Sequence, residues 1–120
     1  MSNTSTRGFS AASWPIRELL PRWERSLLSD GIKAVHVRRY KGYMLTLMRD
    51  FDPSATLEVL TVEAVEQHLA LLERYGYASL NAFLAISQFC RWCVARGFLA
   101  EDPTSRLGRE GREKPRIRRR

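Results

Sequence analysis

The longest apolar segment, SLNAFLAISQFCRWCVAR at residues 79–96, constrains the fold most. Its apolar residues recur at spacings of three and four, which predicts an α-helix. They occupy most of the helix circumference, and a helix of this kind normally lies at the centre of a bundle. The apolar set comprises Leu80, Phe83, Leu84, Ile86, Phe89, Cys90, Cys93 and Val94. The rest of the chain must therefore supply helices that cover this one.

The segment before Gly31 predicts two short helices. A short turn begins near Pro15, and we expect Pro21 to interrupt it because proline removes a backbone hydrogen bond. A second helix starts at Pro21, presents a stripe of Trp23, Leu27 and Leu28, and stops at Gly31, because glycine is the usual residue after a helix end.

The next helix is expected at residues 33–51. Its apolar face contains Tyr40, Tyr43 or Met44, Leu47, Met48 and Phe51, while its basic residues fall largely on other faces. Gly42 lies among those basic residues and costs the helix about 1 kcal/mol relative to alanine. Two interpretations remain open: Gly42 lets another molecule approach the backbone closely, or it has no role.

Thr61 is expected to cap a further helix, because its hydroxyl can accept a hydrogen bond from a free N–H of the first turn. Glu63 lies in that turn, where the helix dipole favours a negative charge. The outer face also carries Glu66, Gln67 and Glu73, so this helix is the least suited to contact DNA. Gly76 ends it, and Gly97 ends the apolar helix that follows.

These segments predict an all-α fold, a small bundle of four to five helices without strands. Residues 1–20 are expected to be a partly disordered N-terminal extension, and residues 21–107 the helical domain. Residues 108–120, GREGREKPRIRRR, hold charge, glycine and proline but almost no apolar residue. Such a segment cannot bury surface, so we expect an extended basic tail.

Positive charge is concentrated at the C-terminal end. Residues 1–105 carry 12 Lys and Arg against 11 Asp and Glu, whereas residues 106–120 carry 8 against 2, a difference of +6. A basic tail is the electrostatic footprint of nucleic-acid binding. The alternative is a solubilising or linker segment.

Cys90 and Cys93 form a Cys-x-x-Cys pair, which raises the question of a zinc or redox site. A zinc site usually needs four ligands, and the chain has two cysteines with His36 and His68 far away in sequence. A thioredoxin-like pair opens a helix after a strand, and no strand precedes these two. We interpret both as small core residues, and no metal or other cofactor is expected.

The motif HVRRYKG at residues 36–42 has three interpretations. His36 and Arg39 match the His-x-x-Arg pattern of one enzyme family's active site. The same helix face would also suit phosphate contacts, or it is only solvated. The catalytic interpretation fails because only 35 residues precede His36 and none reads as the sheet that such a catalytic fold requires. Phosphate contact and a solvated face both remain open.

The order of these segments resembles the N-terminal core-binding domain of tyrosine recombinases, the family of phage integrases and Xer-like recombinases. The resemblance covers roughly residues 21–120 and is densest at the end. There an aromatic-rich helix, a glycine turn, an apolar pair and an acidic residue before proline follow in the family's order. The matching residues are Phe89, Trp92, Gly97, Phe98, Leu99, Asp102, Pro103 and Leu107.

The sequence departs from the family pattern in three places, one of which covers two residues. His36 stands where relatives usually carry threonine, and Asp102 precedes Pro103 where Asn-Pro is common. Ser87 and Gln88 stand where relatives often carry arginine. The lack of arginine at Ser87 and Gln88 weakens the expectation of phosphate contacts from these two positions. It leaves base-edge contact by Gln88 as an option, because glutamine can pair with adenine through two hydrogen bonds.

The resemblance implies an orthogonal, SAM-like bundle that forms half of a clamp around double-stranded DNA, with a linker to a catalytic domain. In the family, the second and fourth helices of the bundle contact DNA. The residues that this assigns to DNA binding are Lys33, His36, Arg38, Arg39, Lys41, Arg49, Asn81, Gln88, Arg91, Lys114, Arg116 and Arg118. Arg38 and Lys41 are the preferred phosphate contacts.

We therefore expect a DNA-binding domain of a site-specific recombinase or integrase. The fragment itself is expected to lack catalytic residues, a small-molecule substrate and a membrane segment, and to be a monomer, while the parent enzyme oligomerises on DNA. No run of 18 apolar residues and no signal-peptide core occur in the sequence, so the protein is expected to stay in the compartment where it is made. The resemblance further implies a cytoplasmic, DNA-associated protein of a prokaryote or phage. The alternative is a helical protein-interaction module with a basic tail.

Overall fold

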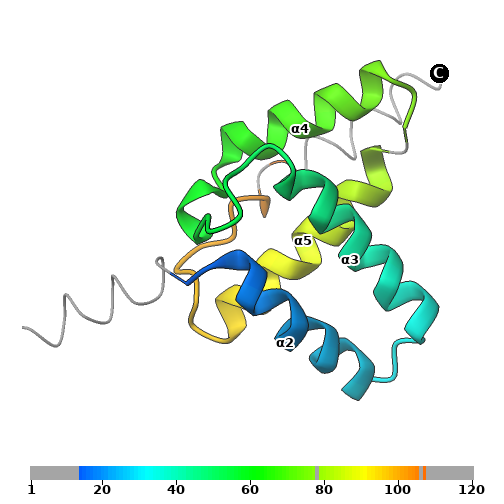
Figure 1. Ribbon diagram of the computed structural model, residues 1–120, viewed down its shortest axis with the longest axis vertical. Coiled ribbons are helices and arrows are strands. Elements are labelled where there is room, and N and C mark those ends of the chain that lie inside the picture. The colour runs from blue at the N-terminus through cyan, green and yellow to red at the C-terminus, as the bar shows by residue number, and fades with distance from the viewer. Residues whose placement is uncertain (1–13, 78, 106, 108–120) are drawn as a thin grey trace, which may run out of the picture.

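The computed structural model describes residues 14–77, 79–105 and 107. Within them four α-helices follow one another: α2 at Ile16–Ser29, α3 at Ala34–Met48, α4 at Val62–Arg74 and α5 at Ser79–Ala95, with a short 3-10 helix η1 at Leu57–Val59 (Figure 1). These described residues contain no strand, only an isolated bridge between Pro15 and Thr56. The predicted small all-α bundle is confirmed.

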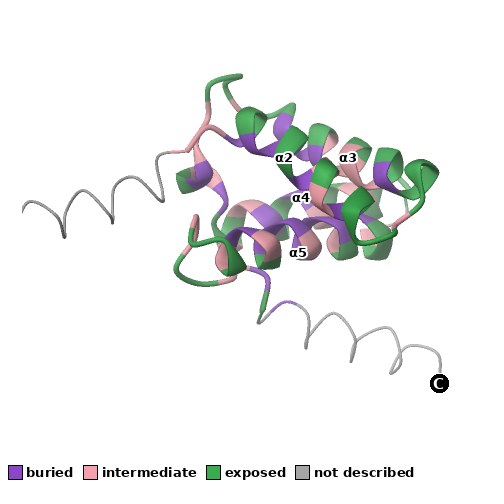
Figure 2. Ribbon diagram, turned by 90° about the horizontal axis from the view of Figure 1, so that it is seen from below, coloured by how far each residue is buried: buried purple, intermediate pink, exposed green. Residues whose placement is uncertain are grey.

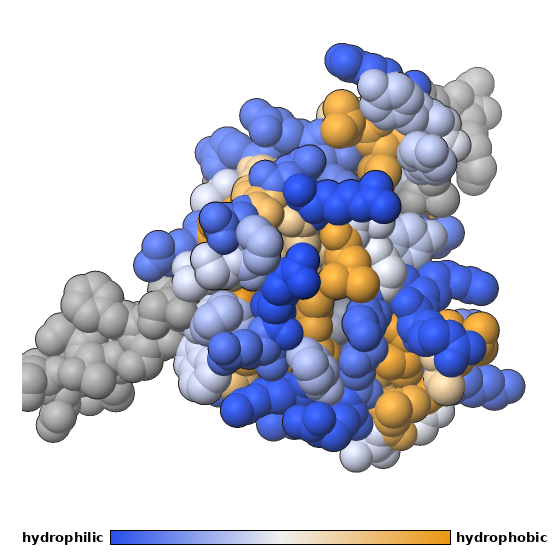
Figure 3. All heavy atoms as spheres, in the orientation of Figure 1, coloured by the Kyte–Doolittle hydropathy of each residue, from blue (hydrophilic) through white to orange (hydrophobic). Residues whose placement is uncertain are grey.

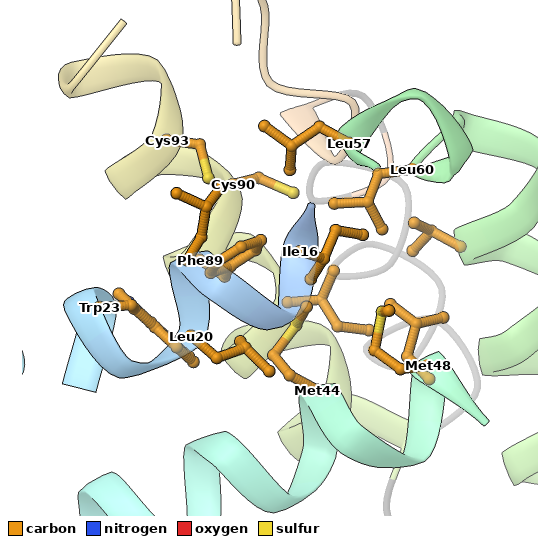
Figure 4. Packing of buried hydrophobic residues seen from close by; sticks show 14 of the residues in the cluster. Ile16, Leu20, Trp23, Met44, Met48, Leu57, Leu60, Phe89, Cys90 and Cys93 are labelled. Atoms are coloured by element: carbon orange, nitrogen blue, oxygen red, sulfur yellow. The ribbon is translucent and has the colours of Figure 1, made fainter. Parts of the chain in front are cut away.

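Helix α5 occupies the centre, as its apolar sequence predicts. It packs against α3 and α4, and α2 packs against α3. Side chains from α2, α3, α5 and the η1 segment converge on one core (Figure 4), including Ile16, Leu20, Trp23, Met44, Met48, Leu57, Leu60, Phe89, Cys90 and Cys93. The rings of Trp23 and Phe89 meet edge to face with centroids 5.2 Å apart, a favoured aromatic geometry.

The predicted helix break at Pro21 is wrong, because α2 runs through it. Proline inside a helix costs about 3 kcal/mol. Ile16 and Leu19, on the N-terminal side of Pro21, are fully buried, and burying such a side chain contributes about 1.5–3 kcal/mol each. Pro21 itself is exposed. Core burial thus outweighs the proline, and the folded domain begins no later than Ile16 rather than at residue 21.

Three helices end as predicted at glycines. Gly31, Gly76 and Gly97 have φ of 92°, 80° and 84°, a conformation that other residues adopt only with strain. After α4, the N–H of Gly76 donates to Glu73 O and the N–H of Tyr77 to Leu72 O. This is the pairing of a Schellman motif, and it turns the chain from α4 into α5.

The predicted N-terminal cap of α4 is also confirmed. The Oγ1 of Thr61 accepts a hydrogen bond of 3.1 Å from the N–H of Ala64. At the end of the described chain, one carboxylate oxygen of Asp102 accepts from both the N–H and the hydroxyl of Thr104, at 2.8 and 2.6 Å. Thr104 and Leu107 are buried, so this end of the domain is tied to the core.

Candidate nucleic-acid interface

Helix α3 presents a basic face to solvent. Its buried side consists of Val37, Met44, Leu47 and Met48. Arg38 and Arg39 in the first half of α3 and Arg49 at its C-terminal end are exposed. Helical periodicity places all three on the side opposite the buried residues. Residues 34–48 include no aspartate or glutamate. From Arg38 to Arg49 the face therefore carries three exposed arginines and no acidic residue, and the exposed Asp50 follows directly after it.

The spacing of these arginines spreads their charge along the helix. Arg38 and Arg49 are eleven residues apart, which is three turns and about 16 Å along the axis. Arg39 directly follows Arg38 and lies on the same exposed half of the helix surface. The predicted residues Lys33 and His36 are exposed at the start of α3, with Lys33 at the N-cap position. Together these five residues cover the length of the helix.

Lys41 differs from the three arginines. Its Nζ lies 3.4 Å from a carboxylate oxygen of Glu24 on α2, and the two side chains are 41% and 23% exposed. The lysine therefore lies at the boundary between α2 and α3, where its charge is already compensated. The sequence pairs Lys41 with Arg38 as the preferred phosphate contacts, whereas the geometry puts Arg38 with Arg39 and Arg49.

The predicted residues of α5 lie on a different surface. Asn81 and Arg91 are exposed and Gln88 is half-buried, while Ala85 between them is fully buried. Because α3 and α5 pack through their buried sides, their exposed residues point away from each other. Figure 2 shows α2 and α3 on one side of the bundle and α5 on the other. The structure does not bring the two candidate sets together.

Two leucines interrupt this surface of α5. Leu80 is 56% and Leu84 is 46% exposed, although both belong to the apolar set that predicts a central helix. The two leucines lie on the side of α5 opposite Ala82, Ile86 and Phe89, which are fully buried, so the neighbouring helices cover the other side of this segment. The exposed arc of α5 thus mixes leucines with Asn81, Gln88 and Arg91. The predicted tail residues Lys114, Arg116 and Arg118 lie outside the described residues.

Charge is separated by helix within the folded part. On α4, Glu63, Glu66 and Glu73 are exposed, as expected for an acidic outer face. Figure 3 shows hydrophilic side chains over much of the face that carries α2 and α3, with hydrophobic ones between them. A polyanion approaching the folded part would meet favourable charge on α3 and repulsion on α4.

Two arginines that the sequence did not single out are held by aromatic rings. The guanidinium of Arg22 lies 5.2 Å from the centroid of Trp14, and that of Arg96 lies 5.4 Å from the centroid of Trp92. Both distances fall within the range of cation–π contacts. These arginines thus have a structural role at the edges of the aromatic cluster.

A groove between α3 and α4 is a feature that the sequence did not indicate. Its volume is about 550 Å³, and it is lined by Leu47, Asp50, Phe51, Ala64, Gln67, His68, Ala70, Leu71 and Arg74. His68 is buried, and both ring nitrogens lack a hydrogen-bond partner among the described residues. Burial lowers the pKa of His68, and nearby Asp50 opposes that effect. In the sequence, the only indication of a buried His68 is that it directly precedes the apolar residue Leu69 of α4.

Cys90 and Cys93 are buried and unpaired, which confirms that they are core residues. Burial raises the pKa of Cys93 to about 12 and that of Cys90 further. Both side chains are therefore thiols at neutral pH rather than reactive thiolates. No group of three or more potential metal ligands occurs in the described part of the chain, nor does any helix there have the length and apolar character to cross a bilayer.

Comparison of the chain with protein-family models, with curated proteins and with solved structures found no match.

Proposed function

We propose that this chain is a DNA-binding helical domain of the tyrosine recombinase or integrase type, which clamps duplex DNA for a catalytic domain of its parent protein. It is a DNA-associated protein of the cytoplasm. The observation that carries the proposal is the face of α3, where Arg38, Arg39 and Arg49 are exposed and no acidic residue intervenes. The basic tail at residues 108–120 adds to the same electrostatic attraction.

Phosphate contacts supply the affinity in this proposal. Each neutralised phosphate releases counterions, so the affinity falls with salt by about 0.9 logarithmic units per contact and per tenfold change in salt. Gln88 and Asn81 on α5 are candidates for base contacts, but they lie on another side of the bundle from the arginines. We assign the first contact with DNA to α3. The residues of α5 would contact the same DNA only if the duplex bends or wraps around the domain.

A charge-matched pair of triple variants tests the proposal. The first replaces Arg38, Arg39 and Arg49 with glutamine. The second replaces Arg17, Arg25 and Arg74, three exposed arginines of α2 and α4, with glutamine as well. The two variants therefore have the same net charge. Binding to a labelled duplex is measured by fluorescence anisotropy at several salt concentrations. The α3 variant is expected to lose about three units of salt slope, and the control variant to keep most of it.

Equal losses in the two variants would show that binding depends on net charge rather than on α3. Wild-type protein whose affinity does not change with salt would overturn the proposal as a whole. Circular dichroism of both variants establishes that they remain folded, which their exposed positions favour.

One observation favours a second function, that of a protein-interaction module. Five of the eight large exposed apolar residues of the described chain lie between residues 71 and 84: Leu71, Tyr75, Tyr77, Leu80 and Leu84. Grouped apolar side chains at a surface are typical of protein contacts. Under this alternative, serine at Tyr75 and Leu80 would weaken partner binding, whereas salt would have little effect on it.

A further inference from the structure

Gly42 is the one described glycine that the fold does not explain. Gly31, Gly76 and Gly97 have positive φ and end helices α2, α4 and α5. Gly42 lies in the middle of α3, and its φ is not positive. Glycine at such a position destabilises a helix relative to alanine. A position that carries this cost without a turn to form calls for another explanation.

Packing within the domain does not require glycine there either. A Cβ atom built on Gly42 meets no heavy atom within 4 Å, and the residue is exposed. Neither a neighbouring helix nor a side chain of the described chain would be displaced by a larger residue. The open backbone at residue 42 therefore serves no contact within the described part of the domain.

The surroundings of Gly42 indicate the chemistry of a molecule that could approach this open backbone. Residues three, four and seven positions away surround a residue on a helix surface. Here they are Val35, Arg38, Arg39, Leu45, Thr46 and Arg49. Three of the six are exposed arginines, and none is acidic. Thr46 turns its hydroxyl back to the carbonyl oxygen of Gly42 at 2.9 Å, so that hydroxyl is held against the helix backbone.

We propose that Gly42 is the point where the backbone of α3 comes into direct contact with a sugar–phosphate strand of DNA. The inference rests on the proposed function and deepens it. Without a side chain at residue 42, the strand approaches to the surface of the helix itself. Arg38 lies about 6 Å before this point along the axis and Arg49 about 10 Å after it, so arginines on both sides of the crossing reach phosphates.

A leucine substitution tests this contact. Gly42→Leu should fold, since its Cβ has open space and leucine is a better helix former than glycine; a melting curve by circular dichroism checks this. We expect it to bind a labelled duplex at least tenfold more weakly than wild type. Its salt slope should also fall, because the added side chain holds the intact arginines away from the phosphates.

The matched control is Ala70→Leu, which adds leucine at an exposed position in the middle of α4. Its affinity should stay within twofold of wild type. Gly42→Gln is the second test variant and excludes an effect of leucine's hydrophobicity. We expect it to lose affinity like Gly42→Leu.

Two failures are distinguishable in this design. Gly42→Leu and Gly42→Gln that bind as tightly as salt-sensitive wild type would overturn the inference and leave the proposed function in place. Wild-type protein that binds without salt dependence, or not at all, would overturn the proposed function and this inference with it.

Discussion

The ammonium of Lys41 on α3 lies 3.4 Å from the carboxylate of Glu24 on α2. This contact joins two helices that are separated by only four residues of turn and strengthens their packing at the surface. It also separates Lys41 from the arginines of α3, although all belong to one basic run in the sequence. Because of this ion pair, we expect Lys41 and the arginines of α3 to contribute differently to DNA binding, although the sequence alone treats them as equivalent.

Replacing Lys41 with glutamine should weaken DNA binding less than replacing Arg38 with glutamine. The Lys41 substitution removes a charge that Glu24 already compensates, whereas the Arg38 substitution removes a charge on the outward face of α3. The loss of the ion pair should lower the free energy of unfolding by no more than about 1 kcal/mol. Anisotropy titrations and urea unfolding measure the two effects. An equal loss of affinity in both variants would contradict the different roles.

Replacing Gly42 with alanine should stabilise the protein by about 0.5–1 kcal/mol. Alanine is the better helix former by roughly that amount, and its Cβ meets nothing in the domain. Urea unfolding measures the change. The matched comparison is Ala70→Gly, at an exposed position of α4, which should destabilise by a similar amount. A destabilised Gly42→Ala protein would mean that α3 packs differently around residue 42.

Replacing Thr61 with alanine should destabilise the protein by about 1 kcal/mol. The hydroxyl of Thr61 caps the N–H of Ala64, and loss of an N-cap side chain typically costs this much. Thr61→Ser keeps the hydroxyl and is the control. Denaturant unfolding of the three proteins should rank wild type and Thr61→Ser together, above Thr61→Ala. Equal stability of the alanine and serine variants would show that the cap is unimportant.

Acid should destabilise the protein through His68. Burial lowers its pKa in the folded state, while the unfolded chain takes up a proton near pH 6.5. The unfolded state therefore binds more protons as the pH falls through about 6.5, and stability decreases by at most about 1.4 kcal/mol per pH unit for this one site. Urea unfolding at a series of pH values should show the decrease.

Two variants identify the residue responsible for this acid effect. His68→Leu removes the titrating group and should flatten the pH dependence between about pH 7 and 5. His36→Gln removes an exposed histidine and should leave the dependence in place. A pH dependence that survives in His68→Leu would assign it to other groups.

Much of the fold was predictable because its signals are local. Glycine at positions 31, 76 and 97 marks helix ends through its own backbone freedom, and the side chain of Thr61 marks a helix start within four residues. The continuation of α2 through Pro21 was not predictable in this way. It depends on how deeply Ile16 and Leu19 are buried by parts of the chain that are distant in sequence.

The candidate interface was predictable only in part, for the same reason. Helical periodicity gives the outward direction of Arg38 and Arg49, because both belong to one helix. The partner of Lys41 and the exposure of Leu80 and Leu84 depend on which neighbouring helix lies beside them, and periodicity does not contain that information. His68 was missed because a buried, unpartnered histidine has no pattern of its own in a sequence.

The salt dependence of binding to duplex DNA tests the central claim most directly. Three phosphate contacts by Arg38, Arg39 and Arg49 predict an affinity that falls about forty-fold between roughly 50 and 200 mM salt. The variant with glutamine at these three positions should lose that part of the dependence, while the variant of Arg17, Arg25 and Arg74 retains it. An affinity that is the same at both salt concentrations, or a loss that is equal in the two variants, would contradict a DNA-binding face on α3.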